Sequence, residues 1–361
     1  MLIKKLILCF AVAVLCAGGV TACSSDDETP SDNQQNNNPQ AQPSKLGEAK
    51  TPTEVRDAMG MGWNLGNQLD AHNNSVSSET AWSQPECTQQ TFNKVAAAGI
   101  KTVRIPVTWM GHIGGAPDYK IDDAWLNRVY EVVGYAEKAG LNAIINIHHD
   151  GYSAQYWLNI KDCANNAQKQ TETVAKLSAI WKQIATKFAD KGHFLVFEAL
   201  NEIQDGGWGW GDNRNDGGRQ YQAMNEWLKA IVETIRSTGG NNATRWIGVP
   251  AYNTDIDLIE HLVLPDDPAK RLMVSIHYYA PYEYTLENLS IITRTALTSW
   301  NSWKGYQEFS GACRLSLFPN GPAKLQGKKR EKKIDHLDFV TIDFHLEFSN
   351  SMQSCTVEAL A

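Results

Sequence analysis

The chain has 361 residues, of which 42% are hydrophobic and 20% charged, and its formal net charge is −7. This composition is typical of a globular protein with a sizeable core, and the acidic balance argues against a nucleic-acid-binding protein. The one basic run, KLQGKKREKK at 324–333, is local and is typical of a solvated helix or tail.

The N-terminus has the pattern of a secretory signal. Lys4 and Lys5 precede an apolar run at 6–20 that is too short for a membrane-spanning helix. The V-T-A-C sequence that ends at Cys23 resembles the lipobox of bacterial lipoproteins, which implies cleavage before Cys23 and a lipid on its thiol. Ordinary signal cleavage nearby, with an incidental Cys23, is the alternative. We expect a secreted protein that is anchored to a bacterial membrane, at the cell surface, through this lipid alone.

Three further segments are expected after the signal at 1–22. Residues 23–50 contain Ser, Asp, Asn, Gln and Pro with almost no aliphatic side chains, so they should form a disordered tether. Residues 51–285 show a regular pattern of elements, and residues 286–361 lose it. Of the seven cysteines, four lie in these last two segments, and their spacing selects none of the three possible disulfide pairings.

Apolar runs alternate with amphipathic helical patterns from residue 60 onward. This alternation predicts a parallel sheet covered by helices. The expected strands are 61–67, 102–109, 141–150, 194–202, 245–252 and 271–281. Each of them carries its polar residues at the C-terminal end, and the chain contains no G-x-G-x-x-G loop. Functional groups at the end of every strand are what a (β/α)8 TIM barrel requires, because all these ends surround one mouth. We therefore predict this barrel, incomplete at its C-terminal end.

Five motifs in order resemble glycoside hydrolase family 5, and in particular its endoglucanase and xyloglucanase branch. They are GWNLGNQLDA (62–71), VRIPVTW (103–109), INIHHDGY (145–152), ALNE (199–202) and SIHYYAPYEYT (275–285). The resemblance implies a β-glycosidase that retains anomeric configuration, acts on β-glucan polysaccharides and needs no cofactor, since both of its catalytic groups are carboxylates.

Glu202 matches the general acid/base of that family. Retaining hydrolysis needs two carboxyl groups about 5–5.5 Å apart, and partial burial would raise the pKa of Glu202 toward the value that a general acid needs. By the resemblance, Asn201 donates to the sugar 2-hydroxyl. The alternative is a strand-end glutamate paired with a basic residue. Ile203 departs from the family, which very often has proline there.

Other strand-end residues are candidates for substrate binding. Arg104 is expected to be a fixed cation beside the nucleophile, or else half of a structural ion pair. Of the adjacent His148 and His149, only one can face the sugar if both lie on a strand, and the resemblance favours His148. For the same reason a metal site at this pair is disfavoured. His277 and Tyr279 share a strand face, and the resemblance implies contacts with the nucleophile and the sugar.

Two tryptophans, Trp208 and Trp210, lie in the glycine-rich stretch DGGWGWGDNRNDGG just after Glu202. A glycine-rich loop with such side chains is more typical of a binding surface than of a core.

The nucleophile is not identifiable. The family places it in a strand that ends G-E-F-G, and no such motif stands in 286–361. Glu308 and Glu347 are weak candidates. The loss of pattern after about residue 290 favours a divergent end, or a truncated or frame-shifted reading of a longer gene, which resequencing across codons 285–310 would decide.

The sequence thus predicts a monomeric endo-β-1,4-glucanase with Glu202 as general acid/base. An enzyme for xyloglucan, mixed-linkage glucan or mannan is a close alternative. A surface glycan-binding lipoprotein without a nucleophile is the alternative from another class.

Overall fold

The computed structural model describes residues 44–73, 76–151 and 156–279 with their side chains. Beyond these it describes the backbone of four strands, β9 (Ala323–Lys324), β10 (Lys333–Ile334), β11 (Thr341–Phe348) and β12 (Met352–Leu360). The expected signal, most of the expected tether and the candidate Glu308 therefore lie outside the described residues.

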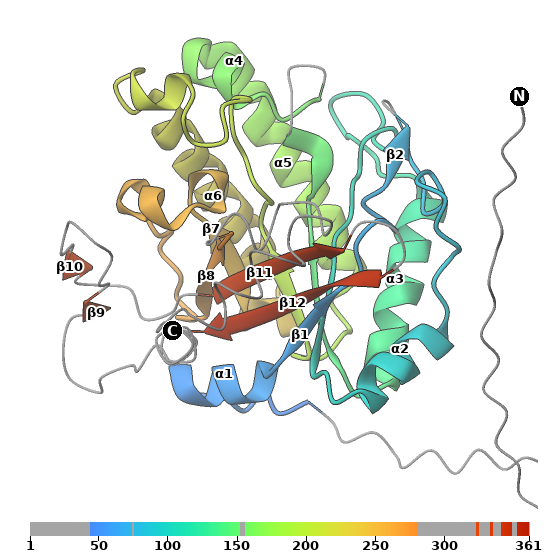
Figure 1. The fold of residues 1–361 in the computed structure, drawn as a ribbon. Coiled ribbons are helices and arrows are strands. Elements are labelled where there is room, and N and C mark those ends of the chain that lie inside the picture. The colour runs from blue at the N-terminus through green and yellow to red at the C-terminus, as the bar shows by residue number, and fades with distance from the viewer. Residues whose placement is uncertain are drawn as a thin grey trace, which may run out of the picture. The chain divides into compact units, whose positions relative to one another are not determined.

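A parallel sheet forms the centre of the fold (Figure 1). Its first strands, in spatial order, are β1 (Gly62–Asn64), β4 (Thr102–Ile105), β5 (Asn142–Asn146), β6 (Leu195–Glu198), β7 (Ile247–Pro250) and β8 (Leu272–His277). The spatial order is also the chain order, and the residues of β4 to β7 are buried throughout. Each strand is hydrogen-bonded to the next in parallel, so their C-terminal ends all lie at one edge.

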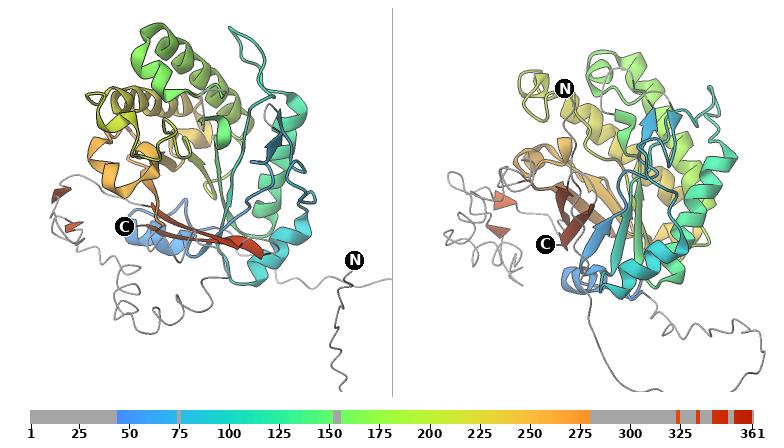
Figure 2. Two further views of the ribbon diagram at one scale, coloured as in Figure 1. Left: turned by 45° about the horizontal axis from the view of Figure 1, so that its top comes forward. Right: turned by 45° about the vertical axis from the view of Figure 1, so that its right-hand side comes forward.

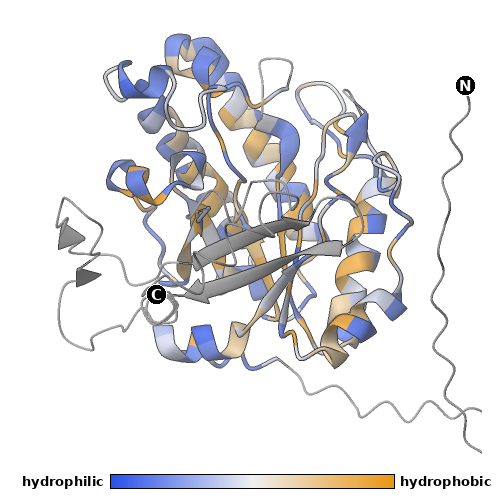
Figure 3. Ribbon diagram, in the orientation of Figure 1, coloured by the Kyte–Doolittle hydropathy of each residue, from blue (hydrophilic) through white to orange (hydrophobic). Residues whose placement is uncertain are grey.

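Helices lie between successive strands from β1 to β7 and cover the outside of the sheet (Figure 2). They are α2 (Gln89–Ala97), α3 (Asp123–Lys138), α4 (Ile160–Asn165), α5 (Ala167–Lys187) and α6 (Arg219–Ser237). The helix α1 (Pro52–Met59) precedes β1, and its buried Val55 and Met59 pack with Val196 and Met273. The helix α3 begins where the Asp122 carboxylate accepts the Ala124 N–H, which is the expected chemistry of an N-cap. The helices turn their apolar stripes inward and their polar faces outward (Figure 3).

Short elements occupy the connections. They are the strands β2 (His72–Asn73) and β3 (Val76–Ser77) and the 3-10 turns η1 (His149–Gly151), η2 (Asp212–Arg214), η3 (Gly240–Ala243), η4 (Tyr252–Thr254) and η5 (Ile256–His261). Apart from η3, these elements all follow the C-terminal ends of strands. Most short elements therefore lie in the loops at the C-terminal edge of the sheet, as in a (β/α) barrel whose functional site is at this edge.

The sheet is a (β/α)8 barrel that is incomplete, as the sequence predicts. The parallel strands β1 and β4 to β8 are six of the eight that such a barrel needs, and β11 adds to β8 in parallel. The next strand departs from the barrel pattern, because β12 runs antiparallel to β11, and it lies beside β1. In the described part of the chain, a hairpin thus stands where two parallel strands with helices would complete the barrel.

The packed domain begins earlier than the predicted boundary at residue 51. Leu46 is fully buried, and it lies in one apolar cluster with Met59, Val196 and Trp246. The Trp246 indole also donates to the Leu46 carbonyl at 3.4 Å. Ala49 belongs to the same cluster, and Arg271 donates to the Gly47 carbonyl at 3.3 Å, so residues 44–50 are packed on the barrel and are not part of a free tether.

Two further observations concern the cysteines and the length of the apolar helices. Of the cysteines with described side chains, Cys87 and Cys163 are both buried and neither is in a disulfide. Among the helices of the described ranges, none combines the length and the apolar character that crossing a bilayer requires.

Candidate active site

Glu202 lies just beyond the C-terminal end of β6, at the edge where all the strand-end loops gather. Its side chain is 18% exposed, and two residues from the end of β8 hold it. His277 Nδ1 lies 2.6 Å from Glu202 Oε1, and the Tyr279 hydroxyl donates to the same oxygen at 3.1 Å. The carboxyl group is thus fixed by neighbours on another strand, and neither of these contacts uses Oε2.

Arg104 lies inside the barrel, where it forms a buried ion pair with Glu198. Their side chains are 1% and 4% exposed, and Arg104 Nε and Nη2 lie 2.9 and 2.6 Å from Glu198 Oε2. The guanidinium also donates to Asn201 Oδ1 at 2.9 Å and to Asn64 Oδ1 at 3.3 Å. The structure thus contains the alternative that the sequence left open, a structural ion pair inside the barrel, and Arg104 connects this pair to Asn201 beside Glu202.

The end of β5 differs from the prediction for its two histidines. We expected adjacent residues on a strand to point to opposite faces, but β5 ends at Asn146 and His149 already begins the turn η1. The chain therefore leaves the strand geometry, and the His148 and His149 rings lie 4.4 Å apart. His148 is buried and faces the Asn146 amide, with His148 Nδ1 and Asn146 Nδ2 3.1 Å apart.

Asp70 joins the two histidines from the loop after β1. One ligand atom from each of the three residues lies within 4.8 Å of the others, a loose form of the arrangement that holds a divalent metal. His149 Nε2 is 3.8 Å from Asp70 Oδ2, and the Gln68 N–H donates to Asp70 Oδ1 at 2.8 Å. Burial raises the pKa of the Asp70 carboxyl to about 6, although three backbone N–H groups partly oppose this.

An aromatic cluster surrounds His149. The His149 ring packs with His72 at 5.7 Å and with Trp82 at 5.6 Å between centroids, and His72 in turn packs with Trp82 at 5.4 Å and with Tyr156 at 5.7 Å. Trp82 is 38% exposed. The Trp82 indole donates to the His72 carbonyl at 3.0 Å, which fixes the orientation of this exposed ring. Loops from β1 and β5 thus combine into a partly exposed aromatic surface beside His148.

The loop after Glu202 is rigidly built and carries the exposed tryptophans. The Asp205 carboxylate accepts the N–H groups of Gly207 and Asn213, at 3.0 and 3.1 Å. Trp208 and Trp210 are 50% and 76% exposed. This arrangement agrees with a binding surface, because the backbone is fixed while the rings face solvent.

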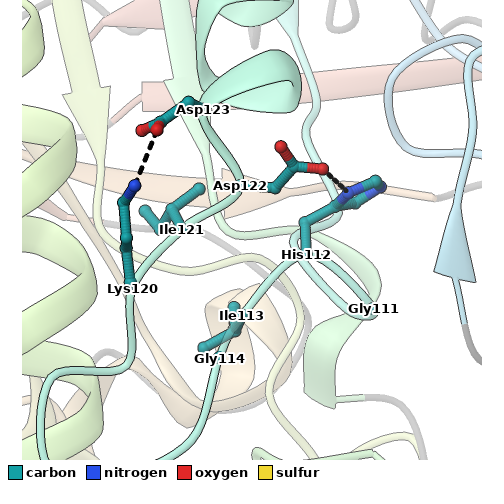
Figure 4. A pocket seen from close by; sticks show the side chains of 8 residues that line it. All are labelled: Gly111, His112, Ile113, Gly114, Lys120, Ile121, Asp122 and Asp123. Carbon is teal, nitrogen blue, oxygen red and sulfur yellow. Dashed lines mark hydrogen bonds and ion pairs between the residues drawn. The ribbon is translucent and has the colours of Figure 1, made fainter.

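A separate hollow of about 380 Å³ lies in the loop between β4 and α3 (Figure 4). Its lining residues are Gly111, His112, Ile113, Gly114, Lys120, Ile121, Asp122 and Asp123. The His112 ring stacks on Trp125 at 4.5 Å, and Lys120 pairs with Asp123 at 2.6 Å. None of the predicted site residues lines this hollow.

The position of the nucleophile is not given by a described side chain. Glu347 lies in β11, of which the structure describes the backbone. In the register between β11 and β8, Asp343 is the residue opposite His277, and Glu347 follows four positions later.

Reasoning from the sequence missed three residues of the site, Asp70, Asn146 and Glu198. For two of them a signal was present. Asn146 lies two positions before His148, and residues at this spacing share a face in the strand predicted over 141–150. Glu198 is a carboxylate inside the apolar run LVFEAL. For Asp70 no periodic signal existed, because it lies in a loop.

The fold and the site define a class of protein, the (β/α)-barrel proteins whose mouth carries a carboxyl group held by neighbouring strands. Within this class the family is clear. The model for the cellulases of glycosyl hydrolase family 5 matches residues 66–310, more than half of the chain, and the chain belongs to this family.

Individual relatives agree with the family. The chain is 38% identical to endoglucanase A of Paenibacillus barcinonensis over 268 residues, which are 70% of this chain and 64% of that one. A solved broad-specificity endoglucanase from Bacteroides salanitronis is 61% identical over 66% of this chain and 63% of that one, with a TM-score of 0.65. A solved family 5 xyloglucanase from Paenibacillus pabuli is 43% identical to this chain, and the match covers 64% of this chain and 65% of that one, with a TM-score of 0.59. The matches thus span less than two thirds of these relatives' lengths.

The raised pKa of Asp70 predicts a pH-dependent stability. Its value of about 6 in the folded chain exceeds the ordinary 3.8, so between pH 4 and pH 6 the folded state holds a proton that the unfolded state releases. The contribution of Asp70 to the free energy of unfolding is therefore greatest below pH 4 and falls as the pH rises to 6. Asp70→Asn, which carries no charge, should gain about 2–3 kcal/mol relative to wild type between pH 4 and pH 7.

Urea unfolding at pH 4 and at pH 7 measures this difference in the free energy of unfolding. The exposed Asp57→Asn is the matched control and should show no such change. Since His149 Nε2 lies 3.8 Å from Asp70 Oδ2, the comparison is repeated with His149→Gln as background. An Asp70→Asn difference that is the same at pH 4 and pH 7 would contradict the prediction.

Proposed function

We propose that this protein is an endo-β-1,4-glucanase that hydrolyses internal β-1,4-glucosidic bonds with retention, and that Glu202 is its general acid/base. The observation that carries the proposal is the carboxyl group of Glu202 at the barrel mouth, held through Oε1 by His277 and Tyr279. Membership of the family and the names of the relatives, two of them endoglucanases and one a xyloglucanase, support the same activity.

The chemistry assigns two roles to Glu202. In the first step a carboxylate nucleophile bonds to the sugar C1 as the C1–O bond breaks, and Glu202 gives its proton to the leaving oxygen. In the second step Glu202 takes a proton from water, whose oxygen attacks C1 and releases the nucleophile. The contacts of His277 and Tyr279 with Oε1 hold the carboxyl group in one place through both steps.

Asn201 would hold the sugar during both steps. Its Oδ1 accepts from Arg104, so its Nδ2 group is directed to other partners and can donate to a sugar hydroxyl. The buried pair of Arg104 and Glu198 fixes this amide in place, so its orientation exists before the substrate arrives. The second carboxyl group that the reaction needs would come from the part of the chain after residue 279.

Replacement of the acid/base tests the proposal. Glu202→Gln keeps the size of the side chain but cannot transfer a proton, so release of reducing sugar from a soluble β-1,4-glucan should fall by about a thousandfold or more. Product anomers followed by NMR in the wild type should show retention.

Asp212→Asn is the control for this experiment. Asp212 lies in the same loop region, its side chain is 62% exposed, and it pairs with Lys161 at 2.5 Å, so its loss should leave the activity nearly unchanged. Hydrolysis at the wild-type rate by Glu202→Gln would refute the assignment of Glu202.

The preferred glucan depends on the loops around the mouth, because strand-end residues serve the reaction while loops contact the polymer. We propose an unbranched β-1,4-glucan, with xyloglucan, mixed-linkage glucan and mannan as the nearest rivals. The exposed Trp210 supports binding of a long chain, since it extends the apolar surface beyond Glu202. Arg214 lies over its ring at 4.5 Å and also donates to the Gly209 carbonyl, which holds the ring in position.

Trp210 should therefore contribute to binding of long but not short oligosaccharides. Trp210→Ala is expected to weaken binding of cellohexaose by about tenfold, equivalent to ~1.4 kcal/mol, and to leave cellobiose binding unchanged. Isothermal titration calorimetry measures both affinities when the variants are made in the Glu202→Gln background, which is expected to be inactive. Trp210→Phe should retain most of the affinity, and Val263→Ala, at a residue that is 67% exposed elsewhere, should retain all of it. An equal loss for both ligands would contradict this role.

A second candidate function follows from the hairpin at the end of the sheet. Since β12 runs antiparallel where the barrel would need a parallel strand, the chain could bind glycans without cleaving them. This candidate predicts that wild type binds cello-oligosaccharides but releases no reducing sugar. The assay that tests Glu202 therefore distinguishes the two functions.

We also propose that the protein acts as a monomer at the bacterial cell surface, anchored through a lipid on Cys23. The lipid anchor is supported by Lys4 and Lys5, by the apolar run at 6–20 and by the V-T-A-C sequence.

Expressed in a bacterium, the wild type should partition into the detergent phase of a Triton X-114 extract, and Cys23→Ala should stay in the aqueous phase. Cys9→Ala, within the same signal, is the control. Wild-type protein in the aqueous phase would rule out the anchor.

A further inference from the structure

A continuous chain of hydrogen bonds connects His148 to the buried ion pair. The Asn146 amide lies at its centre: Nδ2 is 3.1 Å from His148 Nδ1 and 2.7 Å from Glu198 Oε2. Glu198 Oε2 in turn accepts from Arg104. The Asn146, His148 and Glu198 side chains are 1%, 8% and 3% exposed, so water does not compete for these contacts.

The orientation of the Asn146 amide is determined by a backbone group. The Val107 N–H, which can only donate, reaches Asn146 Oδ1 at 3.1 Å. Hence Nδ2 must lie on the other side, where it faces the Glu198 carboxylate and His148. The contact with Glu198 agrees, because a carboxylate oxygen accepts and needs a donor there.

It follows that His148 Nδ1 must accept. A neutral imidazole that accepts at Nδ1 carries its proton at Nε2. Protonation of both nitrogens would place an N–H of His148 against the N–H of Asn146, an unfavourable contact in a buried site. Asn146 thus selects one of the three protonation states of His148.

We propose that Asn146 is a positioning residue that holds His148 neutral with Nε2 protonated, so that this N–H can donate to a hydroxyl oxygen of the bound sugar. The role of the sugar rests on the proposed function, whereas the protonation state of His148 does not. The same state disfavours a metal at Asp70, His148 and His149, because His148 Nδ1 already accepts a hydrogen bond and Nε2 carries a proton.

The protonation state can be measured directly in the protein without substrate. In protein labelled with ¹⁵N-histidine, His148 is assigned by comparison with His148→Gln. The wild type should show a proton on Nε2 and an unprotonated Nδ1 at neutral pH. A proton on Nδ1 would overturn the proposal, whatever the activity of the enzyme.

Asn146→Ala should remove this selection. Its His148 should shift toward a mixture of the two neutral forms or gain a second proton at a higher pH than in wild type. Asn142→Ala is the matched control, since Asn142 is also a buried amide on β5 but contacts Thr102 and the Ala58 carbonyl instead. If both variants show the wild-type spectrum, Asn146 does not set the state of His148. Should Asn146→Ala fail to fold, the wild-type spectrum and Asn146→Ser still decide.

Kinetics distinguish positioning from a structural effect. Asn146→Ala is expected to lower kcat/KM by about tenfold, but should cause little further loss when His148 is already replaced by alanine. Equal losses in both backgrounds would show that Asn146 acts independently of His148. If the wild type does not hydrolyse glucans, the proposed function fails, while the NMR result still tests the role of Asn146.

Discussion

The ion pair between Arg104 and Glu198 is the interaction on which the mouth of the barrel depends. Two charged groups that are almost fully buried are costly to desolvate, and they are tolerated only when hydrogen bonds satisfy the remaining donors and acceptors. Asn64, Asn146 and Asn201 provide these bonds from three different strands or strand ends. The ion pair thus contacts all three amides, and in Asn146 it acts together with the Val107 N–H, so polar groups at the barrel mouth are held by contacts inside the barrel.

The wall of the barrel is regular from β1 to β8 and irregular afterwards. The regular part follows from near-continuous apolar strands, which need helices on the outside and neighbours on both edges. After β8 the sheet continues with the hairpin of β11 and β12, which covers the exposed edge of β8 and so reduces the hazard of an open sheet edge. The barrel therefore departs from its regular pattern only after β8, in the part of the chain where the structure describes the backbone of β11 and β12.

Much of the fold and part of the site could be predicted from the sequence. The six strands follow from apolar runs with polar ends, and Glu202, Asn201, His277 and Tyr279 follow from motifs at those ends. The prediction that His148 and His149 point to opposite faces was wrong. Side chains alternate between two faces only within a strand, and β5 ends at Asn146, two residues before His148. The sequence does contain Glu198 and Asn146, but their partners lie on other strands and become visible only when the sheet is assembled.

The loop after Glu202 leaves little freedom to its backbone. A Cβ atom at Gly207 would collide with the backbone of Gly211, and one at Gly211 would collide with the Asp205 carboxylate. A larger residue at Gly207 would therefore require a different backbone path, and one at Gly211 would displace the Asp205 carboxylate from its backbone partners. The exposed side chains of Trp208 and Trp210 can be exchanged without a change of the backbone, so substitutions at these two positions would alter the surface of the loop and leave its path intact.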